Sequence, residues 1–405
     1  MKKILLIIID GLGDESIPQL GNKTPLEAAK TPNLDFLAKN GICGLVLPWV
    51  EKGKLPTSED THLALFSFDP KISNPGRGVF EVLGIGAKIS KGDLCLRGNF
   101  ATVNERLEIV DRRAGRIENT QPLIDVLNKI KIEGAKILIK KAVSHRIGII
   151  IKSKRKLEIV SQNDPKKVGV EPLKIYPQGF TAKILNEFLE KTHQILKNHP
   201  LNKKRERQGK LPANYILFRG AGKLKKIKKF KEKYGLKSAF IAGGALYKGI
   251  GRYLGMEEIK VKGANALPNT NLRGKILAAK NGLRKYDFIF CHIKAADNLA
   301  EDGNFLSKKE FIGKIDKSIK PLLNLKDNLI AVTADHSTCS ILKSHCKIPI
   351  PILIYSNGAK KLARLSFAEQ KLSGFSEKEC QRGKLGKIKQ IDLMKKILKY
   401  ARGIY

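Results

Sequence analysis

The sequence predicts an α/β protein whose core is a mainly parallel β-sheet covered by helices. Short apolar, β-branched runs alternate with stretches of helical pattern along the chain, which is typical of layered α/β folds. The chain has 405 residues, of which 42% are hydrophobic, so it can bury a large core and is long enough for two domains. Three of the predicted strands are followed by acidic residues, as expected where a sheet binds a ligand at its strand ends.

The first strand is predicted at 3–9, although the opening MKKILLIIID faintly resembles a secretion signal. Its apolar run is short, it ends at Asp10, and no small-residue cleavage site follows, so we interpret it as a buried strand. The first helix is predicted to begin at Thr24, because Pro25 and Glu27 complete a capping pattern. The other strands are expected at 136–140, 147–151, 215–218, 238–242, 286–293, 328–333 and 350–355, and the helices at 24–40, 179–197, 305–324 and 390–402.

The segment 93–232 differs in character from the rest of the chain. It is rich in short strands and long basic stretches, and it holds a polar run at 201–212 that we expect to be a loop. We therefore predict a smaller α/β domain inserted at 93–232, acting as a substrate-binding lid. The core domain would then be discontinuous, built from 1–92 and 233–405.

The chain is strongly basic, with 77 Lys and Arg against 38 Asp and Glu and a formal net charge of +39. The basic residues are spread along the whole chain and aromatic residues are only 6%, so we do not expect a nucleic-acid partner. The charge would instead steer anionic small molecules towards basic clefts. No apolar run approaches the ~20 residues that a membrane helix needs, so no membrane partner is expected.

The six cysteines are scattered without a CxxC pair. This spacing does not predict a disulfide framework, and the expected compartment is a reducing cytoplasm. Structural zinc is not expected either, because no four Cys or His residues cluster in the sequence.

Residues of metal-binding type lie at three predicted strand ends. The carboxyl ends of parallel strands meet at one edge of a sheet, so these side chains could converge. Carboxylate and imidazole together suit Mn²⁺, Zn²⁺ or Fe better than Ca²⁺, and a metal pair can clamp both oxygens of a phosphoryl displacement. The candidates are Asp10 after 3–9, Asp297 and Glu301 after 286–293, Asp335 and His336 after 328–333, and His345 further along.

Ser58 lies in the polar stretch 55–62, which precedes an apolar run. A serine in such a place is ordinarily a loop hydroxyl or a helix cap. Beside metal ions, however, its hydroxyl could lose a proton and become a nucleophile.

Several motifs resemble one family in combination and over nearly the whole chain. The similarity is to the archaeal-type 2,3-bisphosphoglycerate-independent phosphoglycerate mutases, of the alkaline phosphatase superfamily. The motifs that carry it are IDGLGD at 9–14, GNKTPLEAAKTPNLDFLAKNGICG at 21–44, RGNFATV at 97–103, DRRAGR at 111–116, FRGAG at 218–222, ALYKGIGRYLGM at 245–256, HIKAADNLAEDGNF at 292–305, TADHST at 333–338 and SHCKIPIPILI at 344–354.

The resemblance implies an alkaline-phosphatase-like core, two divalent cations of the Mn²⁺ type (Mg²⁺, Co²⁺ or Zn²⁺ being alternatives) and no need for bisphosphoglycerate. The implied reaction interconverts 3-phosphoglycerate and 2-phosphoglycerate, and Ser58 would be the residue that is transiently phosphorylated. Histidine is usual in the family where Glu301 stands. The implied metal ligands are Asp10, Ser58, Asp335 and His336 for one ion and Asp297, Glu301 and His345 for the other; the implied substrate-binding residues are Arg97, Asp111, Arg112, Arg146, Arg219 and Lys248.

Two other functions stay open at this point. The same metal core would serve a phosphatase or another phosphotransferase, because the inserted domain would decide the substrate. A degenerate homologue that binds anions or nucleic acid without turnover is the third reading, supported by Glu301 and the high charge. The sequence does not indicate an oligomeric state.

Overall fold

The computed structural model describes residues 1–357 and 372–404, which form two compact units. The first unit comprises residues 1–74 and 227–405, and the second comprises 75–226. The expected boundaries were 93 and 232. The second unit begins earlier because helix α5 (Arg77–Gly84) packs on strands of that unit, with Val79 and Val82 buried against Cys95 and Ile150.

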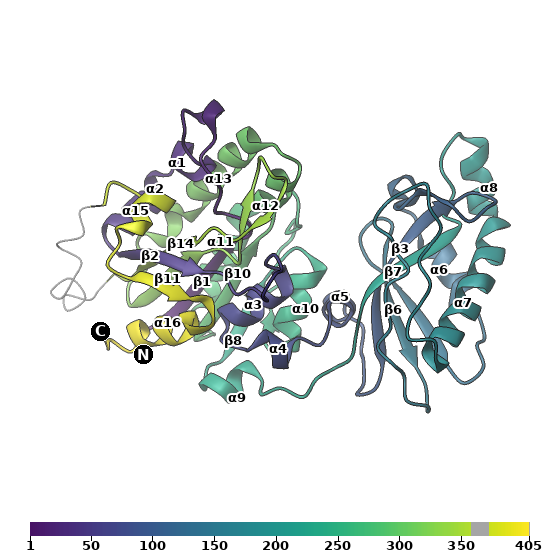
Figure 1. Ribbon diagram of the computed structural model, residues 1–405. Coiled ribbons are helices and arrows are strands. Elements are labelled where there is room, and N and C mark those ends of the chain that lie inside the picture. Colours follow the sequence, from purple (N-terminus) through teal and green to yellow (C-terminus); the bar gives the residue numbers. More distant parts are fainter. Residues whose placement is uncertain (358–371, 405) are drawn as a thin grey trace. The chain divides into compact units, whose positions relative to one another are not determined.

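An eight-stranded sheet forms the core of the first unit (Figure 1). Its central strand, β1, pairs in parallel with β10 on one side and β11 on the other, while β14 runs antiparallel to its neighbours β11 and β2. The strands in spatial order are β15 (Gly386–Lys389), β2 (Ile42–Leu47), β14 (Ile350–Tyr355), β11 (Asn328–Thr333), β1 (Lys3–Ile9), β10 (Phe288–Ile293), β8 (Ser238–Ile241) and β9 (Glu257–Glu258).

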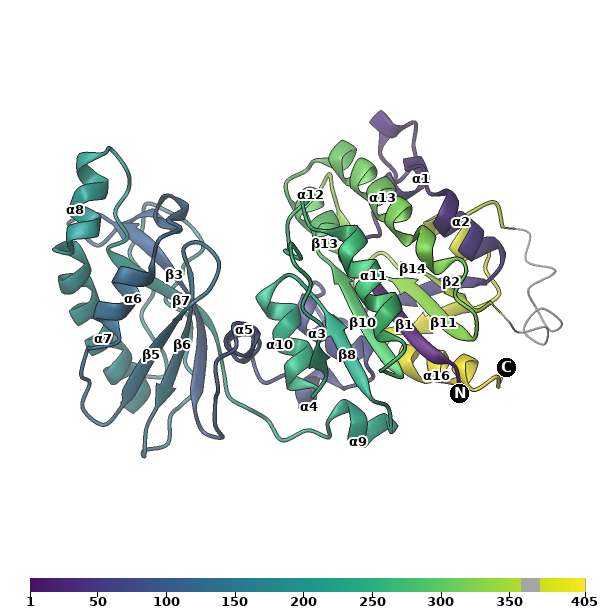
Figure 2. The same ribbon diagram turned by 180° about the vertical axis from the view of Figure 1, so that it is seen from behind.

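Helices cover both faces of this sheet, with α11 and α13 on one face and α10 and α16 on the other (Figures 1 and 2). Every residue from Ile4 to Ile9 is therefore fully buried, which explains why β1 is apolar without alternation. The helices are α1 (Pro25–Ala28), α2 (Pro32–Lys39), α3 (Ser58–Leu65), α4 (Pro70–Ser73), α9 (Phe230–Tyr234), α10 (Ala245–Tyr253), α11 (Leu272–Gly282), α12 (Ala295–Glu301), α13 (Phe305–Ile319), α15 (Glu377–Gln381) and α16 (Leu393–Ala401).

The helix expected at 24–40 is two helices, α1 and α2. Thr24 caps α1 as predicted: its hydroxyl accepts from the amide of Glu27, and the Glu27 carboxylate accepts from the amide of Thr24. The chain leaves the helical conformation at Ala29 and re-enters it at Pro32, because proline cannot continue the preceding helix.

The second unit is an antiparallel sheet in the order β4, β3, β6 and β5, with β7 also pairing with β3. Helices α6 and α7 pack against it and bury its main apolar cluster (Figure 2). Its strands are β3 (Leu94–Val103), β4 (Ile109–Asp111), β5 (Lys136–Lys141), β6 (Arg146–Lys152) and β7 (Tyr215–Gly222), and its other helices are α6 (Gln121–Leu127), α7 (Phe180–Lys197) and α8 (Pro200–Arg207).

A further sequence expectation was wrong. The run expected to be a loop at 201–212 begins with helix α8, whose start is capped by the His199 ring and whose buried Asn202 donates to the carbonyls of Leu196 and Ala213. The cysteine spacing did not predict a disulfide framework, and one disulfide is present, between Cys339 and Cys346. A tight antiparallel pair, β12 (Ser337–Cys339) and β13 (Ser344–Cys346), brings their Cα atoms to 6.0 Å, which is within disulfide range.

Among the helices that the structure describes, none is long and apolar enough to span a bilayer.

Candidate metal centre

The candidate site lies at the carboxyl ends of β1, β10 and β11, the three adjacent central strands of the first unit (Figure 1). Asp10 follows β1 directly, and Asp297 lies in α12, which begins shortly after β10. Asp335 and His336 follow β11. The parallel pairing of these strands brings residues more than 280 positions apart in the sequence to one edge of the sheet.

Two groups of possible metal ligands form there. One comprises Asp10, Asp335 and His336, and the other comprises Asp297, His336 and His345. Within each group the ligand atoms lie within 4.8 Å of one another. His336 belongs to both groups, so the two sets are contiguous. Every member except His345 is fully buried.

The two carboxylates of the first group lack hydrogen bonds that burial normally requires. Both carboxylate oxygens of Asp10 and one of Asp335 accept no hydrogen bond from the residues that the structure describes. Among the described residues, Lys294 is the one ammonium beside these two buried aspartates, at 3.3 Å from Asp10, so bound cations would compensate the remaining charge. Carboxylate oxygens and imidazole nitrogens are also donors that divalent transition metals accept. The residues present therefore fit the divalent cations that the sequence resemblance implies.

The charges of the two aspartates in the first group are coupled. Burial opposes ionisation of Asp10, but Lys294 and His292 outweigh it and hold the pKa of Asp10 well below its usual value. Burial and the neighbouring negative charge of Asp10 raise the pKa of Asp335 well above its usual value. Only one of the two is readily ionised without a further cation, as expected for carboxylates that share a site.

His336 is held as a neutral imidazole. Burial, with His345 stacked on it at a ring-centroid distance of 3.7 Å, lowers the pKa of His336 to about 3. With its ring proton on Nδ1, His336 donates to Thr338 Oγ1 at 3.2 Å, and Thr338 donates in turn to Asp297 Oδ1 at 2.6 Å. This chain leaves His336 Nε2 facing Asp10 and Asp335, as a metal ligand requires.

Ser58 is the first residue of α3 and is 4% exposed. Its Oγ lies 3.3 Å from His336 Nε2, so the serine hydroxyl points into the first ligand group. The preceding Thr57 caps the helix by accepting from the amide of Asp60. The helix start thus orients Ser58, and the positive end of the helix dipole favours negative charge there.

Gly11 allows the strand end to close around the site. Its φ is +66°, and a Cβ at this position would lie 2.6 Å from Thr338 Oγ1 and 2.8 Å from Asp297 Cβ. Any side chain would therefore collide with the two residues that link the ligand groups.

Glu301 stands apart from both ligand groups. It is the last residue of α12, its side chain is 50% exposed, and its Oε1 lies 3.7 Å from His345 Nε2. Burial and the charge of Asp297 raise the pKa of Glu301. The structure thus places it next to one candidate ligand, at the rim of the site.

Sequence reasoning missed three polar residues packed behind the ligands. His62 donates from Nδ1 to the carbonyl of Ser58 at 2.7 Å, and His292 Nε2 lies 3.1 Å from Asp10 Oδ2. The ammonium of Lys294 lies 3.3 Å from Asp10 and also bridges to Asp297. The spacing of four residues between Ser58 and His62 places both on one face of a helix, and this spacing could have indicated His62. No sequence pattern distinguished His292 and Lys294, which lie at the end of an apolar strand.

The cationic candidates of the second unit cluster on neighbouring strands. Arg97 on β3 is paired in register with Arg219 on β7, and Arg146 lies on β6, the other neighbour of β3. Arg97 Nη1 lies 3.4 Å from Glu81 Oε1. Burial nevertheless lowers the pKa of Arg97 to about 9, with the surrounding arginines adding to the effect.

The remaining three candidates have partners within their own units. Arg112 makes two hydrogen bonds, of 2.9 and 2.7 Å, to the carboxylate of Asp164. Asp111 accepts from the amides of Arg113 and Gly115, as a turn-forming aspartate does. Lys248, in the first unit, lies 3.1 Å from Glu258.

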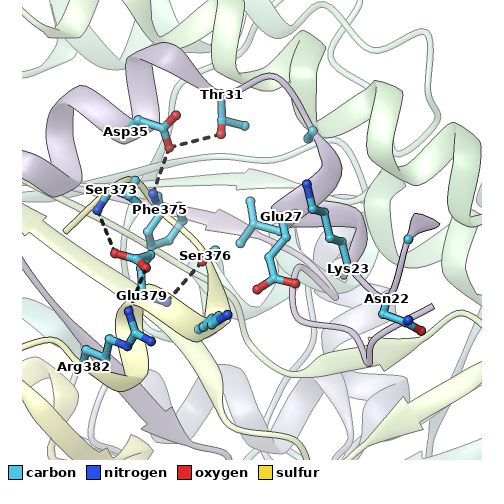
Figure 3. Close-up of a pocket in the computed structure, with 15 residues that line it drawn as sticks. Asn22, Lys23, Glu27, Thr31, Asp35, Ser373, Phe375, Ser376, Glu379 and Arg382 are labelled. Atoms are coloured by element: carbon cyan, nitrogen blue, oxygen red, sulfur yellow. Dashed lines mark hydrogen bonds and ion pairs between the residues drawn. The ribbon is translucent and has the colours of Figure 1, made fainter. Parts of the chain in front are cut away.

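A hollow of about 540 Å³ elsewhere in the first unit is lined by α1, α2 and the segment 373–382 (Figure 3). Its acidic side chains are already engaged. Asp35 accepts from the amide of Phe375 and from Thr31, and Glu379 accepts from the amide of Ser373. The hydrogen bond from Phe375 to Asp35 thus connects the segment 373–382 to α2. None of the candidate metal ligands lines this hollow.

Comparison with known proteins is consistent with this geometry. A family model described as the Metalloenzyme superfamily matches residues 2–400. The chain is 41% identical, over 96% of each chain, to a protein of Archaeoglobus fulgidus named 2,3-bisphosphoglycerate-independent phosphoglycerate mutase 1. A similarly named protein of Methanocaldococcus jannaschii is 38% identical, over 98% of this chain and 96% of that one.

Two solved structures resemble it over nearly their full length. A protein of Pyrococcus horikoshii superposes with a TM-score of 0.86 and 33% identity, covering 99% of this chain and 97% of that one. The cofactor-independent phosphoglycerate mutase of Thermoplasma acidophilum gives a TM-score of 0.70 and 34% identity, covering 99% of this chain and all of that one.

Proposed function

The chain belongs to the 2,3-bisphosphoglycerate-independent phosphoglycerate mutases of the Metalloenzyme superfamily, and on this premise we propose that it interconverts 3-phosphoglycerate and 2-phosphoglycerate without bisphosphoglycerate. The observation that carries the proposal is the position of Ser58. Its hydroxyl lies 3.3 Å from His336, where two carboxylate–imidazole groups meet. The reaction belongs to glycolysis and gluconeogenesis, and we place it in the cytoplasm.

The proposed mechanism uses Ser58 as a temporary phosphate carrier. Ser58 Oγ attacks the phosphorus in line, the bond from phosphorus to the glycerate oxygen breaks, and the serine proton ends on that released oxygen. The other glycerate hydroxyl then attacks the phosphoserine, and its proton returns to the serine oxygen. The phosphoryl group therefore stays with the enzyme throughout the cycle.

Asp10, Ser58, Asp335 and His336 would hold one divalent cation, and Asp297, Glu301 and His345 the second. His336 also lies within reach of the second group. Bound divalent cations would lower the charge repulsion between nucleophile and phosphate and would stabilise the transferring group. We propose Mn²⁺ as the ion, with Mg²⁺, Co²⁺ and Zn²⁺ as alternatives that metal analysis would distinguish.

The arginines of the second unit would bind the anionic groups of the substrate. Arg97, Arg146 and Arg219 lie on adjacent strands, and guanidinium groups grip carboxylate and phosphate through paired hydrogen bonds. We also propose Asp111, Arg112 and Lys248 as substrate-binding residues, as the sequence predicts. Holding glycerate while it reorients, and excluding water, would favour the mutase reaction over hydrolysis of the phosphoserine.

The test is a Ser58→Ala variant assayed in both directions with Mn²⁺ and without bisphosphoglycerate. Activity is expected to fall by at least 10³-fold, because the covalent step needs the hydroxyl. The variant should still fold and still bind metal through the remaining ligands. Ser318→Ala is the matched control, since this serine only donates to a carbonyl of its own helix turn.

Mass spectrometry of wild-type protein quenched during turnover should find phosphate on Ser58. Wild-type turnover by the Ser58→Ala variant would end the covalent mechanism. Release of inorganic phosphate in place of 2-phosphoglycerate would instead favour a phosphatase built on the same site.

A further inference from the structure

The two strands that carry His345 and Thr338 form a small ribbon of their own. Among the strands that the structure describes, β12 and β13 pair only with each other and are not part of the eight-stranded sheet. The pairing covers three residues on each side, with Thr338 directly opposite His345. An isolated two-stranded ribbon is marginally stable in water, so this one needs further support.

The first strand of the ribbon is firmly anchored. The amide of Thr338 donates to the carbonyl of Gly13 at 3.0 Å, and the amide of Ser340 donates to Asp14 at 3.0 Å. Asp14 is itself held by the fully buried ammonium of Lys308 at 2.8 Å. Strand β12 is thereby tied to the chain just after β1 and to helix α13.

The second strand has fewer attachments among the residues that the structure describes. Beyond the short pairing, His345 donates from Nδ1 to the carbonyl of Pro56 at 2.8 Å. The turn between the strands is open to solvent, with Ile341 and Leu342 50% and 61% exposed. Besides the turn at 340–343, strand β13 is joined to the anchored strand by a cross-link, the disulfide from Cys346 to Cys339, both of which are buried.

The disulfide lies beside the ligand that depends on it. Cys346 is adjacent in sequence to His345, whose Nε2 lies 3.4 Å from Asp297 Oδ1. Cys339 is adjacent to Thr338, which hydrogen-bonds to both Asp297 and His336. The cross-link therefore joins the neighbour of His345 to the neighbour of Thr338, the residue that hydrogen-bonds to the other two members of the Asp297–His336–His345 group.

We propose that the Cys339–Cys346 disulfide positions His345 for metal binding, so that its reduction weakens binding of a divalent cation at the Asp297–His336–His345 group. The inference rests on the proposed function, because it takes that group to be a metal site. The bond forms when both thiols lose their protons and two electrons to a disulfide-class oxidant, which leaves as two thiols. Reduction by a dithiol reverses the exchange.

The experiment compares oxidised wild type, wild type reduced with dithiothreitol, and the double variant C339S/C346S. In the oxidised protein, alkylation after denaturation should label four cysteines, and reduction should raise the number to six. Mn²⁺ titration by calorimetry should show one class of site weakened by about ten-fold or more on reduction, which is the usual effect of losing a group that orients a ligand. The double variant should bind Mn²⁺ with the same affinity as the reduced wild type, and dithiothreitol should not change that affinity.

Cys43→Ser is the matched control, because this free cysteine is buried in β2 and should leave the response to dithiothreitol intact. Hydrogen–deuterium exchange of residues 337–346 without metal gives a second readout, and reduction should increase exchange there. Equal Mn²⁺ affinity and equal exchange in both redox states, or six alkylated cysteines in the oxidised protein, would overturn the inference. Increased exchange with no Mn²⁺ binding in any state would refute the metal site of the proposed function while leaving the bracing role of the disulfide intact.

Discussion

At the scale of single residues, two candidate ligands are oriented by neighbours that are not ligands. His345 is oriented by the carbonyl of Pro56, and His336 by Thr338. Position 11 requires glycine because Asp297 and Thr338 occupy the space that a side chain would need. These supporting contacts matter because metal affinity falls steeply when a ligand loses its orientation.

Glu377 provides a prediction about pH at this scale. Burial raises its pKa to about 7 from the usual 4.5, although Thr24 and the amide of Asp14 donate to it. Because the folded state holds this proton more tightly than the unfolded state, its contribution is full below about pH 4.5 and is lost as the pH rises to about 7. The loss is at most about 3.5 kcal/mol, since each pKa unit corresponds to about 1.4 kcal/mol.

A Glu377→Gln variant, which stays neutral at every pH, should therefore lose less stability than the wild type between pH 5 and pH 8. Melting temperatures of both proteins at the two pH values measure the difference. Glu187→Gln is the control, because that glutamate lies in a solvent-exposed pair with Lys191. An identical drop in melting temperature for Glu377→Gln and wild type would contradict the pKa shift.

At the scale of elements, helix α5 holds the arginine cluster of the second unit in place. Gly78 packs so closely on β3 that a Cβ there would lie 2.3 Å from the carbonyl of Cys95. This contact brings Glu81 within 3.4 Å of Arg97 on β3, and Arg77, four residues earlier on the same helix, lies at the same distance from Glu81. The Arg97 guanidinium is buried among other arginines, so the Glu81 carboxylate offsets their mutual repulsion.

Glu81→Gln should consequently raise the KM for phosphoglycerate by about ten-fold while changing kcat much less, because one charge-assisted contact is worth about 1.5–3 kcal/mol. Steady-state kinetics in both directions would show the split. Glu81→Asp, which keeps the charge, should recover part of the loss. A fall in kcat with unchanged KM would contradict a role in positioning Arg97.

At the scale of the whole molecule, loss of the bound metal should lower both the mutase activity and the thermal stability. Removing divalent cations with a chelator should abolish mutase activity and lower the melting temperature of the first unit. The buried carboxylates of Asp10 and Asp335 would then lose the ions that compensate them. Restoring Mn²⁺ at about 100 times its dissociation constant should return about 2.7 kcal/mol of stability per site.

Calorimetric scans of chelated and reloaded protein, beside a coupled mutase assay, would measure this effect. The Asp10→Asn/Asp335→Asn variant is the control, because it lacks the carboxylates that bind the ion and should not respond to Mn²⁺ at the first group. Full activity after exhaustive chelation, confirmed by elemental analysis, would contradict the metal requirement.

The sequence alone determined the main layers and the outline of the metal centre. Strand β1 was predictable because an unbroken apolar run ending at Asp10 needs burial on both faces, and β11 and β14 were found with the bounds expected. The convergence of Asp10, Asp297 and Asp335 followed from one rule of parallel sheets. Local periodicity carries this information, because it records which side of each element faces the core.

Only the tertiary structure decided which residues of different elements come into contact. Ser58 and His336 meet across 278 positions, and His292 and Lys294 face Asp10 from a neighbouring strand. Strand β3 was missed because Gly98 and Asn99 interrupt its apolar pattern, while its backbone hydrogen bonds are satisfied by pairing with other strands, mainly β6 and β7. Contacts of this kind depend on strand register and chain path, which no local pattern encodes, and the disulfide beside His345 arose from them as well.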